Sequence, residues 1–173
     1  MKQFNFKSII REVPDFPIKG ILFYDITTLL KDKKGFKKAV DGLVEKYKGK
    51  KIDVVVAIES RGFILGSVVA YKLGAGFVVV RKKGKLPAKT LSASYGLEYG
   101  KDTLEIHEDA IKPGDKVLIV DDLLATGGTV KAVTDLVQQL KGKVVGIAFL
   151  IELVFLKGKE KLKGYPIHSV IKY

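Results

Sequence analysis

Short apolar runs rich in β-branched residues alternate along this chain with segments of helical periodicity. The runs predicted to form buried strands occupy residues 53–58, 76–80, 116–120, 144–153 and 167–171. Helices are predicted over 32–48, 63–73 and 129–140, where apolar residues recur at helical spacing. Asp32 is the expected N-cap of the first helix, and Gly74 is expected to end the second. Because the strands are apolar on both faces and alternate with helices, the pattern favours an α/β fold. Its core is a central, mostly parallel sheet with helices on both faces.

A β-hairpin is predicted in the middle of the chain. Its strands are 90–97 and 103–107, and the sequence Glu98–Tyr99–Gly100–Lys101 joins them. The length of 173 residues, without an internal repeat or linker, indicates one domain spanning 1–173.

The composition is that of a globular protein, with 47% hydrophobic and 29% charged residues. The absence of cysteine excludes disulfides, zinc–thiolate sites and cysteine nucleophiles. No signal peptide is evident, and the apolar run 144–156 is interrupted by Gly146 and Glu152. We therefore expect no membrane partner.

The formal net charge of +12 raises the possibility of a nucleic-acid partner. However, only Arg11, Arg61 and Arg81 are arginines, and arginine is the usual reader of base edges. The lysines are scattered over predicted helix faces and termini, which is typical of a solvated surface. We expect no nucleic-acid function, and a positive field that attracts a small polyanionic substrate.

Two acidic residues followed by a turn of glycine and threonine give the strongest functional signal. Asp121 and Asp122 follow the strand predicted at 116–120, and Ala125–Thr126–Gly127–Gly128–Thr129 leads into a helix. Glycine lets a ligand approach the backbone, and free N–H groups at a helix N-terminus favour phosphate. Carboxylates cannot bind phosphate directly, but they accept hydrogen bonds from sugar hydroxyls. The combination predicts a ribose 5-phosphate site.

Other interpretations of this segment explain less of it. The chain contains no GxxxxGK[ST] sequence, so a Walker-type loop is excluded. A glycine-rich connection with exposed aspartates would account for the glycines, but not for paired acids followed by two threonines.

The motif resembles the phosphoribosyl-diphosphate signature of the type I phosphoribosyltransferase family. Four more segments resemble the adenine branch of that family: 16–23, 59–63, 81–87 and 94–100. The resemblance implies a sheet core with a small N-terminal hood, here residues 1–31, and a mobile β-hairpin loop. It also implies transfer of phosphoribose from 5-phosphoribosyl 1-diphosphate to adenine, giving AMP and diphosphate in purine salvage. A cytoplasmic homodimer is expected, with Mg²⁺ held mainly through the substrate diphosphate and by no direct protein ligand.

The resemblance also assigns roles to residues. Asp121 and Asp122 would hold the ribose hydroxyls, and the turn 125–129 would hold the 5-phosphate. The diphosphate would meet Ser60, Arg61, Arg81, Lys82, Lys85 and Tyr99. Ser60 and Arg61 would form a loop with an unusual peptide geometry. The base would be recognised by Leu22, Phe23 and Tyr24.

Elementary chemistry agrees with these roles. Departing diphosphate carries negative charge that arginine forks stabilise, and the ribose ring becomes positively charged, so Arg61, Asp121 and Asp122 are candidate catalytic residues. Glu98 is the candidate acid/base for the proton that moves on the base. The reactive intermediate must be kept from water, which favours closure of the loop around 87–101.

Base specificity is less constrained, because Tyr24 stands where adenine-specific relatives commonly carry arginine or lysine. Another purine could be the acceptor: hypoxanthine, guanine or xanthine. A sensor that binds phosphoribosyl diphosphate without chemistry is a further alternative, although such regulators normally carry an added DNA-binding module.

Overall fold

The computed structural model describes residues 4–97 and 100–173, apart from the side chains at 97, 100 and 101. The chain divides into two compact units, the first ending at Gly42 and the second spanning Leu43–Tyr173. No helix in the described parts of the chain is long and apolar enough to cross a membrane.

The first unit contains a two-stranded antiparallel sheet that the sequence did not predict. Its strands are β1 (Arg11–Pro14) and β2 (Leu22–Asp25), followed by α1 (Thr27–Lys31) and the start of α2 (Lys33–Glu45). Strands of four residues with mixed polarity give no periodic signal. The side chain of Asp32 accepts a hydrogen bond of 2.6 Å from the N–H of Gly35, which confirms Asp32 as the predicted N-cap of α2.

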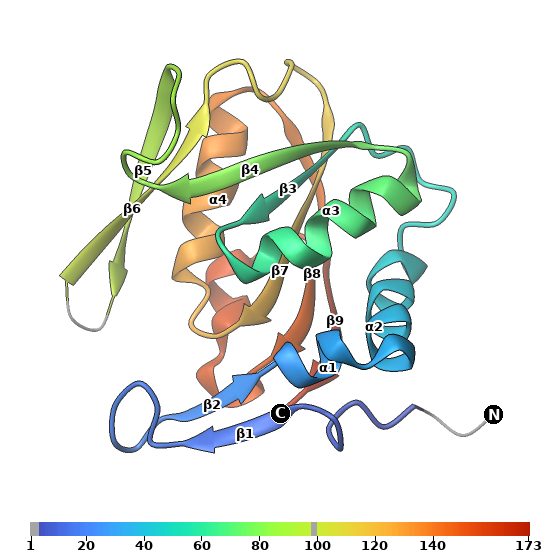
Figure 1. Cartoon of the computed structure of the whole chain (residues 1–173). Coiled ribbons are helices and arrows are strands. Elements are labelled where there is room, and N and C mark those ends of the chain that lie inside the picture. Colours follow the sequence, from blue (N-terminus) through green and yellow to red (C-terminus); the bar gives the residue numbers. More distant parts are fainter. Residues whose placement is uncertain (1–3, 98–99) are drawn as a thin grey trace. The chain divides into compact units, whose positions relative to one another are not determined.

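The second unit is built on a seven-stranded sheet in the order β5-β6-β4-β3-β7-β8-β9 (Figure 1). The strands β4, β3, β7, β8 and β9 are parallel neighbours, whereas β6 pairs antiparallel with β4 and β5. Their bounds are β3 Val54–Ile58, β4 Gly76–Lys82, β5 Thr90–Leu97, β6 Gly100–His107, β7 Lys116–Leu124, β8 Lys143–Glu152 and β9 Ile167–Lys172. The mostly parallel sheet and the hairpin confirm the predicted architecture.

The helices α3 (Arg61–Leu73) and α4 (Gly128–Gln139) cover opposite faces of the parallel strands (Figure 1). Alternate residues of β3 point to the two faces: Val56 packs in the core that contains Val133 of α4. On the other face, Ala57 lies so close to Gly66 of α3 that a Cβ added there would sit 2.5 Å from that of Ala57. Each strand is therefore apolar on both sides, as its sequence predicted.

Two differences between the predicted and the observed elements matter for the site. The strand β7 was expected to end at residue 120 but continues to Leu124, which is in register with Glu152 of β8. The acidic pair therefore lies within a strand, because ladder pairing with β8 continues past the apolar run. The connection from β8 to β9 contains two 3₁₀-helices that were not predicted, η1 (Val154–Leu156) and η2 (Gly158–Leu162).

Candidate functional site

The turn between β7 and α4 encloses a small cavity of about 70 Å³. Gly127, the N-cap of α4, has φ +79°, a left-handed conformation that glycine adopts without steric cost. The first N–H groups of a helix have no partner within it, and the positive end of the helix dipole favours an anion there. The cavity brings together most of the predicted phosphate-binding residues; it is lined by Asp121, Leu123, Leu124, Ala125, Thr126, Gly127, Thr129 and Val130.

The acidic pair is almost completely buried at this end of the sheet. Asp121 and Asp122 are 9% and 6% exposed, and the N–H of Asp122 donates to Oδ1 of Asp121 at 2.9 Å. Burial, reinforced by the charge of Asp122, raises the pKa of Asp121 well above its usual range. Burial also raises the pKa of Asp122, against the opposing charge of Arg61. A ligand that donates hydrogen bonds to these two carboxyl groups would therefore stabilise their charged form.

The raised pKa of Asp121 has a consequence for stability. Folding raises this pKa above 3.8, so the stability that the carboxyl contributes is present below pH 3.8 and is lost as pH rises through the raised pKa. Asparagine cannot ionise. The substitution Asp121→Asn is therefore expected to raise the melting temperature more at pH 8 than at pH 5. Thermal denaturation of both proteins at several pH values measures the difference, and a difference that shrinks as pH rises contradicts the expectation.

Arg61 links the acidic pair to the start of α3. It is the first residue of that helix, and its Nε lies 2.8 Å from Oδ2 of Asp122. The preceding Glu59–Ser60 peptide is cis, the unusual geometry that the family resemblance led us to expect for this loop. Ser60 is exposed. Two of the predicted groups, the ribose acids and the diphosphate loop, thus meet at one point.

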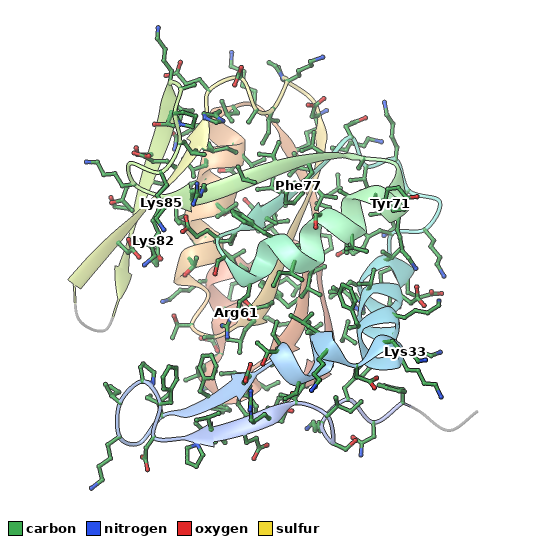
Figure 2. The ribbon with its side chains drawn as sticks, in the orientation of Figure 1. Lys33, Arg61, Tyr71, Phe77, Lys82 and Lys85 are labelled. Atoms are coloured by element: carbon green, nitrogen blue, oxygen red, sulfur yellow. The ribbon has the colours of Figure 1, made fainter. Side chains whose placement is uncertain are left out.

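Glu59 binds the other cationic residues that were predicted to contact the diphosphate. Its Oε2 lies 3.3 Å from Nε of Arg81 and accepts the N–H of Lys82 at 3.0 Å, and its Oε1 is paired with Nζ of Lys85. Arg81 also donates to the carbonyl of Lys85 at 3.1 Å. Figure 2 labels Arg61 at the start of α3, Lys82 at the end of β4 and Lys85 in the loop that follows β4. Glu59 was not predicted as a site residue, because its partners lie more than twenty residues further along the chain.

The hairpin of β5 and β6 contacts both parts of the site. Nζ of Lys82 lies 3.0 Å from Oδ2 of Asp102 on β6, and this hydrogen bond raises the pKa of Lys82. Tyr95 donates to the same oxygen at 3.3 Å. Burial raises the pKa of Tyr95, while a hydrogen bond with Thr129 in the turn 125–129 lowers it. The candidate residues Glu98 and Tyr99 lie outside the described residues.

The predicted base-binding residues belong to the first unit. Leu22, Phe23 and Tyr24 are consecutive on β2, and the ring of Phe23 packs edge-on against Phe16 with centroids 5.1 Å apart. Tyr24 pairs in register with Glu12 of β1, and burial followed by the charge of Glu12 raises its pKa. The other described candidate residues all lie in the second unit.

Known proteins resemble both the sequence and the structure. The family model for the phosphoribosyl transferase domain matches residues 27–167. An adenine phosphoribosyltransferase of Acidobacterium capsulatum is 60% identical over 96% of this chain and 92% of its own.

Two solved structures extend the resemblance to the fold. The adenine phosphoribosyltransferase of Thermoanaerobacter pseudethanolicus superposes with a TM-score of 0.94 at 56% identity, covering 97% of this chain and 98% of the other. The Saccharomyces cerevisiae enzyme, solved with an imino-altritol bisphosphate and adenine, has a TM-score of 0.90 at 43% identity, with 95% and 96% covered.

Proposed function

Because this chain belongs to the phosphoribosyltransferase family and within it to the adenine phosphoribosyltransferases, we propose that it converts adenine and 5-phosphoribosyl 1-diphosphate into AMP and diphosphate. Such a pentosyltransferase serves purine salvage. The observation that supports the proposal is the cavity at the turn 125–129, which is lined by Thr126, Gly127 and Thr129 next to the buried acidic pair Asp121 and Asp122.

The chain's own groups supply binding and charge stabilisation. The N–H groups of the turn and the hydroxyls of Thr126 and Thr129 would hold the 5-phosphate. The carboxylates of Asp121 and Asp122 would accept hydrogen bonds from the ribose hydroxyls. As the bond to diphosphate breaks, the ribose ring gains positive charge, which these buried carboxylates would stabilise strongly in a site of low dielectric constant.

The leaving diphosphate would be bound by the cations at the ends of β3 and β4. Arg61 offers a planar fork, and Arg81 and Lys85 are held in place by Glu59. Mg²⁺ bound to the diphosphate would neutralise further charge. No three His, Cys, Asp or Glu side chains within 4–97 and 100–173 are grouped as metal ligands. We propose that Mg²⁺ is held mainly through the substrate diphosphate, as is usual for an ion that keeps several of its waters.

Base recognition is proposed for the first unit. The backbone of Leu22 would recognise adenine, Phe23 would contribute to the same pocket, and Tyr24 would stack on the base or hydrogen-bond to it. Glu98 would move the proton on the base, and Tyr99 would meet the diphosphate when the hairpin loop closes over the site.

A panel of bases tests the function directly. The protein is incubated with 5-phosphoribosyl 1-diphosphate and one purine at a time, with Mg²⁺ or with excess EDTA. We expect AMP from adenine in the presence of Mg²⁺, and no nucleotide from hypoxanthine, guanine or xanthine. IMP, GMP or XMP would reassign the base. Binding of 5-phosphoribosyl 1-diphosphate without nucleotide formation from any base would indicate a sensor.

We also propose that the protein is a cytoplasmic homodimer. Exposed apolar side chains on α3 and β4 support the self-association: Ile64, Tyr71 and Phe77 are 43%, 86% and 39% exposed. Figure 2 labels Tyr71 and Phe77. Sedimentation equilibrium should give twice the chain mass of 19.0 kDa. A single-chain mass at micromolar concentration contradicts the dimer.

A further inference from the structure

The connection between β8 and β9 is in direct contact with the phosphate turn. The N–H of Leu153, just after β8, donates to the carbonyl of Leu124 at 2.9 Å. The chain then passes through η1 and reaches η2, whose first residue, Gly158, is buried. These contacts place η2 beside the residues that follow β7.

Gly158 and the phosphate turn meet backbone to backbone. A Cβ added to Gly158 would lie 2.1 Å from the carbonyl oxygen of Ala125 and 3.0 Å from Cδ1 of Leu124. A Cβ added to Gly127 would lie 2.3 Å from the carbonyl oxygen of Gly158. Atoms do not approach so closely, and backbone atoms cannot move aside as the end of a side chain can. Any side chain at position 158 must therefore displace the turn.

Two anchors prevent η2 from moving away instead. Nζ of Lys159 lies 2.8 Å from Oε2 of Glu152, a residue only 5% exposed at the end of β8. Leu162, at the end of η2, is 1% exposed and packs in the core with Val130 and Val133 of α4. The segment is thus fixed to the sheet at one end and to the helix at the other.

We propose that Gly158 is a positioning residue for the 5-phosphate, in that η2 supports the turn 125–127 from behind and sets the direction of its N–H groups. This inference rests on the proposed function. The contact is between backbone atoms. The position of the turn therefore depends on the absence of a side chain at Gly158 and not on a hydrogen bond. A shift of the turn by about 1 Å would misplace donors whose effect depends on geometry.

The substitution Gly158→Ala tests the inference. We expect the KM for 5-phosphoribosyl 1-diphosphate to rise by ~10²-fold and the affinity for ribose 5-phosphate, measured by calorimetry, to fall by a similar factor. The KM for adenine should not change. A purely structural role would lower stability without this selective loss.

Gly142→Ala is the matched control. Its added Cβ would collide with side chains in the core, 2.9 Å from Ile111 and Val137, at the end of α4 remote from the phosphate turn. We expect a loss of stability with unchanged affinity for ribose 5-phosphate. If Gly158→Ala fails to fold, Lys159→Met removes one anchor without adding atoms near the turn, and should weaken ribose 5-phosphate binding several-fold.

The outcomes separate the inference from the proposed function. If the wild-type protein forms AMP but neither Gly158→Ala nor Lys159→Met weakens ribose 5-phosphate binding more than Gly142→Ala does, the positioning role is wrong and the function stands. If the wild-type protein neither forms AMP nor binds ribose 5-phosphate, the function itself is wrong.

Discussion

The double variant Asp121→Asn/Asp122→Asn is expected to lower kcat/KM for AMP formation by ~10²–10⁴-fold. A hydrogen bond to a charged group contributes about 1.5–3 kcal/mol, so losing two of them raises the barrier by about 3–6 kcal/mol. The loss should fall mainly on kcat, because the carboxylates stabilise positive charge that develops only in the transition state. Steady-state kinetics with both substrates varied measures the split.

The fold should survive this change, because asparagine has nearly the shape of aspartate and removes buried like charges. A matched control is Glu108→Gln/Asp109→Asn, which changes two adjacent but exposed acids by the same charge. It should have near-normal kinetics. Near-normal turnover of the Asp121/Asp122 variant would refute the ribose-hydroxyl role of the pair.

Arg61→Leu should lower kcat/KM by ~10²–10³-fold, the scale observed when one preorganised donor to a developing anion is removed. The residue has two effects, because its guanidinium faces the diphosphate in the proposal and pairs with Asp122 in the structure. Its charge lowers the pKa of Asp122 against the effect of burial. Without it, the pKa of the pair rises further, so the acidic limb of the pH profile should move to higher pH.

Inhibition by diphosphate separates these effects. Arg61→Leu should weaken this inhibition, whereas Arg11→Leu should not, although it also removes an Arg–Asp pair, that of Arg11 with Asp25 at 2.6 Å in the first unit. Arg61→Lys should restore only part of the activity, since lysine keeps the charge but lacks the fork. Unchanged diphosphate inhibition together with an unshifted pH profile in Arg61→Leu would exclude both effects.

The sequence predicted the parts of the fold that depend on local signals. Asp32 caps α2, and Gly74 ends α3 in a left-handed conformation with φ +65°, both as residue chemistry indicated. The apolar runs became the parallel strands. The hood strands β1 and β2 and the 3₁₀-helices η1 and η2 were missed, because short segments of mixed polarity carry no periodic signal.

The site was predicted in its residue types but not in its connections. The turn 125–129 follows directly in the chain, so its proximity to Asp121 could be predicted. The pairing of Lys82 with Asp102, and of Lys85 with Glu59, depends on strand order and hairpin register. The contact of Gly158 with Ala125 depends on a tertiary approach of two backbones. Neither leaves a pattern in a single sequence.

A crystal structure of the protein with AMP would test the account most directly. We expect the phosphate of AMP to lie in the cavity at Ala125–Thr129 and to accept hydrogen bonds from the N–H groups of that turn. The ribose hydroxyls should donate hydrogen bonds to Asp121 and Asp122. A phosphate bound anywhere else on the protein, with this cavity occupied only by water, would contradict it.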